Sequence, residues 1–300
     1  MESSQSKPKA IVICGPTGIG KTSFAIQLAR SFQGEIIGAD SMQIYRHMDI
    51  GTAKPIAAER SMVPHHMVDI VDPDEPFDAE TYATRSLSIV MALQARQLVP
   101  FVVGGTGLYI KALIHGLFDA RPGDEGIRMR LKQKAEKEGT EALFERLKQV
   151  DPVAARKLHA NDSYRIIRAL EVYETAGIPI TEYQRRHRFQ ESRLTTLKFG
   201  LYMERDRLYE RIDQRVDMMV RAGLLDEVRG LRESGYSGVL KSMQSIGYRH
   251  MCDFLDGHLD WPEAIRTLKR DTRRYAKRQM TWFKADRELV WLAPLVSGEV

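Results

Sequence analysis

The sequence predicts a mixed α/β fold, in which helices flank a parallel sheet and an all-helical domain is inserted into the α/β core. Two observations indicate this fold. Short apolar, β-branched runs alternate with segments of helical spacing over residues 1–118. Between Asp119 and about Arg193 strand-like runs disappear, charged residues become frequent, and apolar residues recur at helical spacing. We therefore expect a core domain of residues 1–118 and 196–300 and a helical domain of residues 119–195.

The strand-like runs of the core domain are short and apolar, as expected for buried strands of a parallel sheet. Strands are predicted at five places: 10–14, 35–39, 68–71, 98–103 and 197–202. Helices are predicted over 21–32, 108–117 and 208–231. A further helix is predicted to begin near Asp260, because Asp260 and Glu263 have capping-box spacing and Pro262 falls in the first turn.

The composition leads us to expect a globular, cytoplasmic protein without a membrane segment. The chain has 300 residues and is 43% hydrophobic, but no apolar run approaches the roughly 20 residues that cross a bilayer. Residues 1–9 are polar and lack the apolar stretch of a signal peptide. Cys14 and Cys252 are far apart in the sequence, so both are expected to be small buried residues rather than a disulfide or zinc site.

A glycine-rich segment follows the first predicted strand and opens the first predicted helix. Its residues, Gly15-Pro16-Thr17-Gly18-Ile19-Gly20-Lys21-Thr22, match the pattern G-x-x-x-x-G-K-[ST]. In such a loop the backbone N–H groups converge on phosphate oxygens, Lys21 neutralises the phosphate charge, and the Thr22 hydroxyl binds Mg²⁺. The segment predicts a phosphate-binding site in a P-loop NTPase-like core.

The strand that carries a magnesium-binding acid in ordinary P-loop NTPases ends differently here. Residues 101–103 lead into Gly104-Gly105-Thr106, which argues against an ATPase or a small-molecule kinase. Asp40 or Asp69 could still serve the metal. Asp40 directly follows a predicted strand, where open α/β sheets bind ligands, so its carboxylate either faces the same crevice as Lys21 or caps the following segment.

These motifs resemble those of the tRNA dimethylallyltransferases, also called tRNA isopentenyltransferases. The resemblance extends from about residue 10 to residue 292 and is carried by eight segments in family order: 15–22, 40–55, 64–69, 103–109, 161–165, 168–171, 244–249 and 277–283. The C-terminal zinc finger of eukaryotic relatives is absent from this sequence, so the chain is similar to the bacterial type.

The resemblance implies a reaction and assigns roles within it. The ligand of the P-loop is the diphosphate of dimethylallyl diphosphate, which Mg²⁺ helps to bind. The acceptor is the exocyclic amine of the adenosine on the 3′ side of the tRNA anticodon. Asp40 is then the base that accepts the amine's proton, and Thr106 contacts the acceptor. Arg215 is similar to the family's additional diphosphate-binding arginine, with Arg211, one helical turn earlier, as the alternative.

The resemblance also implies a tRNA-binding surface. The residues that it points to are Asp40, Ser41, Met42, Gln43, Thr106, Arg128, Tyr164, Arg165, Ile166, Ile167, Arg168, Gln244, Arg249, Arg273, Arg274, Lys277 and Arg278. The acceptor base must leave its stack to reach Asp40, and Gln43 offers both a donor and an acceptor to a base edge. Tyr164 stands where Gln or Arg is common in the family.

A basic run near the C-terminus suits a phosphate backbone. Residues 266–278 contain seven basic residues against one acid, Asp271, and four of them share one helical stripe: Arg266, Arg270, Arg273 and Lys277. Stripes of this kind also occur on helix faces that only meet solvent.

Three other functions remain possible on the sequence alone. An enzyme that prenylates free adenine nucleotides would need neither the inserted domain nor the basic run. A P-loop kinase would release ADP, and a non-catalytic RNA-binding switch would not depend on Asp40. We expect a monomer that binds a tRNA anticodon stem-loop.

Overall fold

The computed structural model describes residues 7–117, 124–187 and 191–293. The chain divides into two compact units, residues 1–114 with 193–300 and residues 115–192. The changeovers lie a few residues before the positions expected from the sequence, 118/119 and 195/196. Within the described residues no helix is both long enough and apolar enough to span a bilayer.

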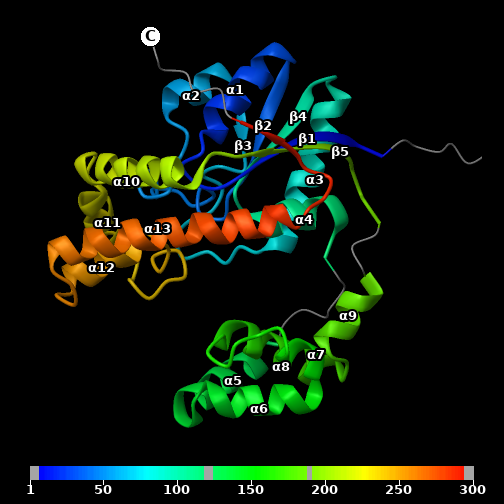
Figure 1. Ribbon diagram of the computed structural model, residues 1–300, viewed down its shortest axis with the longest axis vertical. Coiled ribbons are helices and arrows are strands. Elements are labelled where there is room, and N and C mark those ends of the chain that lie inside the picture. The colour runs from blue at the N-terminus through cyan, green and yellow to red at the C-terminus, as the bar shows by residue number, and fades with distance from the viewer. Residues whose placement is uncertain (1–6, 118–123, 188–190, 294–300) are drawn as a thin grey trace, which may run out of the picture. The chain divides into compact units, whose positions relative to one another are not determined.

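The first unit is built on a six-stranded, fully parallel sheet in the order β3-β2-β4-β1-β5-β6 (Figure 1). The strands are β1 (Lys9–Cys14), β2 (Gly34–Ala39), β3 (His65–His66), β4 (Val99–Gly104), β5 (Thr195–Leu201) and β6 (Val290–Leu292). The predicted parallel sheet is thus confirmed. The short strand β6 was not predicted.

The strand expected at residues 68–71 is wrong. The chain pairs with β2 earlier, through His65 and His66, and then leaves the extended conformation. Met67 and Asp69 have φ values of 61° and 56°, in the left-handed region, which interrupts a regular strand. Val71 keeps only an isolated parallel bridge to Tyr45.

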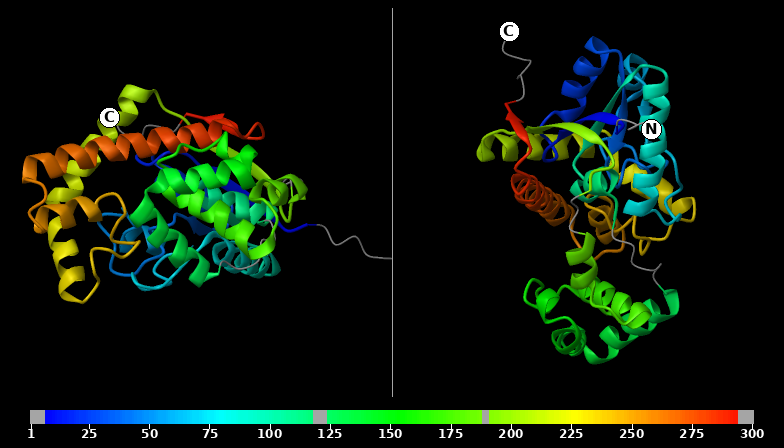
Figure 2. Two further views of the ribbon diagram at one scale, coloured as in Figure 1. Left: turned by 90° about the horizontal axis from the view of Figure 1, so that it is seen from below. Right: turned by 90° about the vertical axis from the view of Figure 1, so that its right-hand side faces the viewer.

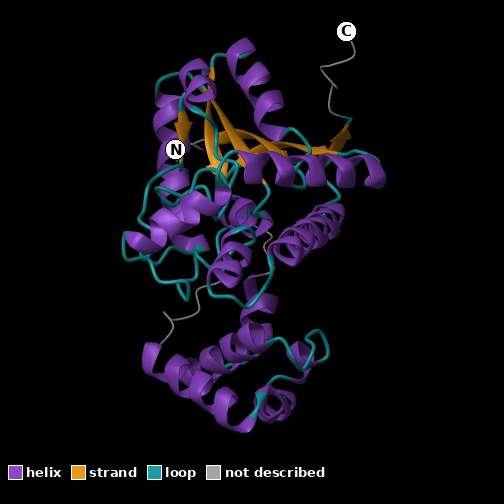
Figure 3. Ribbon diagram, turned by 90° about the vertical axis from the view of Figure 1, so that its left-hand side faces the viewer, coloured by secondary structure: helices purple, strands orange, loops and turns teal. Residues whose placement is uncertain are grey.

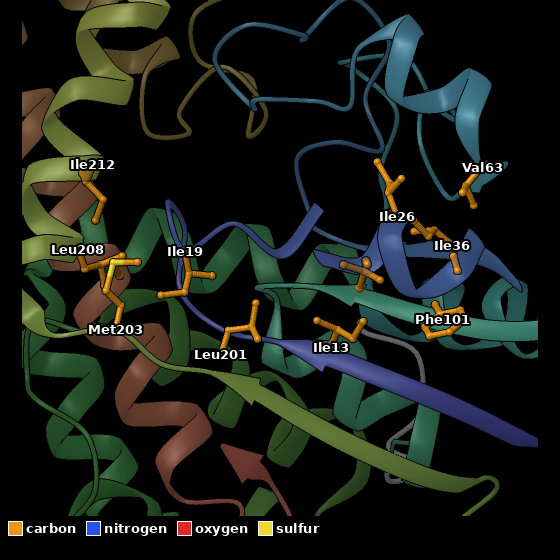
Figure 4. Close-up of a cluster of buried hydrophobic side chains, with 14 residues drawn as sticks. Ile13, Ile19, Ile26, Ile36, Val63, Phe101, Leu201, Met203, Leu208 and Ile212 are labelled. Carbon is orange, nitrogen blue, oxygen red and sulfur yellow. The ribbon is translucent and has the colours of Figure 1, made fainter. Parts of the chain in front are cut away.

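The core of the first unit lies between the sheet and helix α1 (Lys21–Ser31). Alternate residues of the strands, including Ile13, Ile36 and Phe101, point into this cluster, as the period of two requires (Figure 4). Helix α3 (Ala79–Ala95) also packs on β1, β2 and β4. Figure 3 shows helices on both sides of the sheet, the arrangement expected for parallel strands.

The remaining helices of this unit are α2 (Ala57–Met62), α4 (Gly107–His115), α10 (Arg205–Arg221), α11 (Leu224–Glu233), α12 (Tyr248–Leu255) and α13 (Trp261–Lys284). The single helix predicted over 208–231 is wrong. Gly223, with φ 97°, breaks it into α10 and α11, because a left-handed residue cannot continue an α-helix.

Helix α13 begins where the sequence predicted it. The Asp260 carboxylate accepts the N–H of Glu263 at 2.8 Å, and Pro262 lies in the first turn. Along its length α13 packs against both α10 and α12 (orange in Figures 1 and 2).

The second unit has only helices among its described residues: α5 (Glu125–Glu138), α6 (Thr140–Val150), α7 (Pro152–Ala155), α8 (Ser163–Ala176) and α9 (Ile180–His187). It has its own core, in which Leu131, Leu143, Leu147 and Leu170 are buried with Ile166. Separate cores are the mark of separately packed units.

We predict that Ile19→Ala destabilises the protein through the P-loop. The Ile19 side chain is 1% exposed and packs with Leu208 and Ile212 of α10 (Figure 4), so removing it should lower the free energy of unfolding by about 2–5 kcal/mol. Urea unfolding measures this loss. Phe32→Ala, at a side chain that is 58% exposed, is the control and should shift stability far less; equal losses would contradict the anchoring role of Ile19.

Candidate functional site

A cavity of about 1220 Å³ opens at the carboxyl ends of the central strands. Its walls come from the P-loop, the turn after β2, the end of β4, the segment 46–60, and helices α10 and α13. Residues that sequence reasoning assigned to chemistry and that line this cavity are Thr17, Gly18, Gly20, Lys21, Thr22, Asp40, Gln43 and Arg215, together with the alternatives Asp69 and Arg211. Segments more than 200 residues apart in sequence therefore form one site.

The P-loop exposes its main chain to the cavity and turns one side chain into the core. Gly18 and Gly20 have φ values of 81° and 96°, which other residues rarely adopt. Gly15 and Pro16 lie behind the cavity wall, where their carbonyl oxygens accept hydrogen bonds from Lys21 Nζ at 3.0 and 2.8 Å. Ile19 is buried in the core, so only its main chain can serve a ligand.

The Lys21 ammonium is held in an unusual electrostatic environment. Burial lowers the pKa of Lys21 to about 8, and the nearby Asp40 carboxylate partly opposes this shift. A partly buried cation that keeps its charge near neutral pH is well suited to an anionic ligand, which provides it with charge-assisted hydrogen bonds.

Asp40 does both things that the sequence allowed. Its Oδ1 accepts the backbone N–H groups of Met42 and Gln43 at 2.9 and 3.4 Å, so the carboxylate caps the turn that follows β2. The same side chain lines the cavity and interacts electrostatically with Lys21 and Arg215. The turn therefore fixes the carboxylate within the crevice.

Arg211 and Arg215 occupy different places on α10. Arg211 Nε donates to the Gly18 carbonyl at 3.2 Å and so supports the P-loop. Burial lowers the pKa of Arg215, the Asp40 carboxylate raises it, and the neighbouring Arg211 lowers it again. Both guanidiniums line the cavity, as Lys21 and Asp40 do.

Thr106 joins the two turns that border the cavity. Its Oγ1 accepts the N–H of Ser41 at 3.0 Å, which links the turn after β4 to the turn after β2. Tyr275 of α13 interacts with Thr106, and burial raises the pKa of the Tyr275 phenol. The structure thus brings Thr106 next to the segment that carries Asp40.

Gln279 is a site residue to which sequence reasoning gave no role. Its Oε1 accepts the N–H of Thr17 at 2.9 Å, and its Nε2 donates to the Gly105 carbonyl at 3.0 Å. A Cβ on Gly105 would clash with the Gln279 amide, and one on Gly107 would clash with Trp282. The glycines after β4 therefore admit α13. The only signal in the sequence was that Gln279 falls within a family-like segment.

Ion pairs occupy much of the basic run on α13. Arg273 binds both oxygens of Asp213 at 2.5–2.7 Å, and Lys269 lies 2.7 Å from Asp217, so both hold α10. Arg266 pairs with Glu263 at 2.5 Å.

Asp271 of α13 forms ion pairs with cations of both α12 and α13. Arg249 and Arg270 donate to it, and hydrogen bonding from Arg270 helps to hold the pKa of Asp271 at about 2. The stripe expected from the sequence is thus partly neutralised. Exposed basic side chains remain at Arg274, Lys277 and Arg278. Gln244 is also exposed and donates to the Gly238 carbonyl.

The second unit presents some of its expected tRNA contacts and buries others. Arg128 and Arg168 each donate to Oε2 of the buried Glu171 at 3.0 Å. Tyr164 and Arg165 are exposed. Ile166 and Ile167 are buried in the core of this unit, so their side chains cannot reach RNA. Both lie on the apolar face of α8, which packs against the core, whereas Tyr164 and Arg165 lie on its exposed face.

Residues 43–286 match the family described as IPP transferase. The chain belongs to the IPP transferase family. Two of its relatives are tRNA dimethylallyltransferases, from Desulfatibacillum aliphaticivorans and Desulfosudis oleivorans. They are 53% and 50% identical over 289 and 287 residues; each match covers 96% of this chain, and 94% and 91% of the respective relative.

Solved structures of IPP transferases have the same fold. The tRNA isopentenylpyrophosphate transferase of Bacillus halodurans is 44% identical with a TM-score of 0.70, and the match covers 96% of this chain and 90% of that one. A eukaryotic dimethylallyltransferase, seen in crystallographic snapshots acting on tRNA, is 31% identical with a TM-score of 0.79, covering 96% and 75%. The family resemblance and fold class expected from the sequence are confirmed.

We predict that this IPP transferase binds pyrophosphate more weakly as pH rises through 8. Only the ammonium form of Lys21 attracts the anion, so the binding energy is fully present below its pKa of about 8 and is lost above it. Lys21→Arg stays charged throughout and corrects for titration of pyrophosphate itself. Calorimetry with Mg²⁺ between pH 7 and 9 should show a several-fold rise in the ratio of wild-type to variant Kd; a constant ratio would refute the assignment.

Proposed function

We propose that this chain transfers a dimethylallyl group from dimethylallyl diphosphate to the exocyclic amine of the adenosine on the 3′ side of the anticodon in tRNA. The observation that carries the proposal is the placement of Asp40 at the end of β2, in one cavity with Lys21 and Arg215. β4 ends in Gly104 rather than in an acid, which disfavours nucleotide hydrolysis. The names of the relatives agree with this reaction.

In the proposed reaction, the charged groups of the cavity act one after another. As the bond from the allylic carbon to the diphosphate oxygen breaks, Lys21, Arg215 and the P-loop N–H groups stabilise the charge gathering on pyrophosphate. The adenine nitrogen forms the new C–N bond, and Asp40 accepts its proton, because an amine conjugated with the ring is a poor nucleophile. Pyrophosphate leaves with the electron pair of the broken bond.

The residues present fit a bound Mg²⁺. The Thr22 hydroxyl lines the cavity beside Lys21, and within the described part of the chain no three His, Cys, Asp or Glu side chains cluster as a metal cage. Mg²⁺ commonly binds through one or two protein oxygens, water and the substrate's phosphates. When bound at Thr22, it would neutralise charge on the diphosphate.

We further propose that the enzyme acts as a monomer in the cytoplasm on the tRNA anticodon stem-loop. A free nucleotide would not require the exposed cations of α13 or of the second unit, which supports tRNA over free adenine nucleotides as the acceptor.

We predict that Asp40→Asn abolishes turnover but leaves RNA binding intact. Asn keeps an oxygen for the turn's N–H groups but cannot take up the proton, so kcat should fall by about 10²–10⁴-fold. The assay follows the mass of an anticodon stem-loop incubated with Mg²⁺ and dimethylallyl diphosphate. If the wild-type protein adds no prenyl mass, or instead releases ADP from ATP, the proposed function fails.

We predict that replacing Arg274, Lys277 and Arg278 together by Ala weakens stem-loop binding. Losing three phosphate contacts should lower the slope of log Kd against log salt by about 2. The matched control removes three other exposed cations, Lys9, Arg30 and Arg205, and should change the slope less. Fluorescence anisotropy at several salt concentrations measures both, and equal slopes would disprove a binding role for this face of α13.

A further inference from the structure

The side-chain amide of Gln43 has one orientation that the surrounding main chain permits. Its Nε2 donates to the carbonyl oxygens of Thr52 and Ala53, both at 3.1 Å. An amide nitrogen carries two hydrogens, and both are used. The reversed amide would set its oxygen against two carbonyl oxygens, so the network fixes which end faces outward. Gln43 lines the cavity, and the group it has left to offer there is its Oε1 acceptor.

The segment that supplies these two carbonyls is held by a carboxylate from α11. Glu227 accepts the N–H groups of Asp49 and Ile50 at 2.9 and 2.7 Å through Oε2, and that of Gly51 at 3.1 Å through Oε1. The hydroxyl of the fully buried Tyr248 donates to the same Oε1 at 2.6 Å. Four donors thus converge on one carboxylate, which makes it a strong and directional anchor.

Close packing reinforces this anchor. A Cβ on Gly51 would overlap the ring of Tyr248, so the segment lies directly against α12. The buried Lys54 ammonium adds a second anchor, since its Nζ binds the Tyr45 carbonyl at 2.8 Å and the Asp69 carboxylate at 2.6 Å. The carbonyls of Thr52 and Ala53 therefore have fixed positions before any ligand arrives.

We infer that Gln43 selects the base that is prenylated, because the only group it offers to that base is a hydrogen-bond acceptor. Glu227 is the positioning residue that holds the Gln43 amide in this orientation. The inference rests on the proposed function. Asp40 and Gln43 belong to one turn and both line the cavity, so an entering base meets two acceptors. A primary aromatic amine has two N–H donors and matches them, one hydrogen going to Asp40 and the other staying on Gln43. A base with a carbonyl in that position is repelled by both.

The test compares binding of three anticodon stem-loops that carry adenosine, inosine or purine riboside at the acceptor position. Purine riboside lacks both amine and carbonyl, so the ratio of the inosine Kd to the purine Kd reports repulsion alone. Gln43→Leu removes the acceptor at similar size. We expect it to weaken adenosine binding about tenfold and to lower the inosine-to-purine ratio at least several-fold.

Glu227→Gln should lower the inosine-to-purine ratio as Gln43→Leu does, with pyrophosphate affinity unchanged. Glu233→Gln, an exposed carboxylate of the same helix, is the matched control and should leave the ratio as in wild type. Combining Glu227→Gln with Gln43→Leu should lower the ratio no further than Gln43→Leu alone, because both act through one amide. Tyr248→Phe, which removes one donor from Glu227, provides a milder variant for the same measurement.

An unchanged inosine-to-purine ratio in Gln43→Leu would overturn the inference. An unchanged ratio in Glu227→Gln and Tyr248→Phe would overturn the part assigned to Glu227. Neither result affects prenyl transfer by the wild-type protein, so failure of this inference is distinguishable from failure of the proposed function.

Discussion

The parallel pairing of β1, β4 and β2 is the constraint on which the rest of the site depends. Register sets Cys14 opposite Gly104, and Gly104 opposite Ala39, so three neighbouring strands end at the same level. The residues that follow them are the P-loop, the Gly105–Thr106 turn and Asp40. A side chain at position 104 would overlap the Ala39 carbonyl, so glycine is needed for this register. The groups proposed to bind phosphate and to accept the proton are adjacent because their strands are adjacent.

Helix α13 converts this adjacency into a fixed geometry. Gln279 hydrogen bonds to the P-loop on one side and to the turn after β4 on the other. Nearer the N-terminus of α13, Arg273 and Lys269 bind acids of α10, the helix that carries Arg215. One helix therefore connects the P-loop, the turn after β4 and the helix that carries Arg215. It also explains two of the glycines after β4, whose role is to let a helix approach rather than to bind phosphate.

Local signals in the sequence were enough for most of the fold and for the centre of the site. The P-loop pattern predicted a segment that does line the cavity, and the strand before Asp40 allowed its carboxylate either to face the crevice or to cap the next segment; it does both. Long-range pairing was not readable: the apolar run 68–71 has strand composition, but the left-handed residues Met67 and Asp69 prevent it from continuing β3. Gly223 broke a helix whose apolar spacing continued across it.

Contacts between residues far apart in the sequence could not be predicted either. Gln279 and Glu227 act through main-chain groups more than 170 residues away, and no local pattern marks them. The same limit applies to charge, because a helical wheel shows where cations lie but not which acids face them. The acids that face α13 come from α10, and their effect is to hold it in place.

This pairing changes what the basic helix can do. A helix with seven cations in thirteen residues would repel itself if all of them met solvent. Asp213, Asp217 and Asp271 neutralise its inner and flanking positions, which lets α13 pack against α10 and α12 and bring Gln279 to the P-loop. The cations left exposed, at Arg274, Lys277 and Arg278, lie within five residues of Gln279 in sequence. Whatever anion they bind is thereby held next to the helix segment that positions the reaction site.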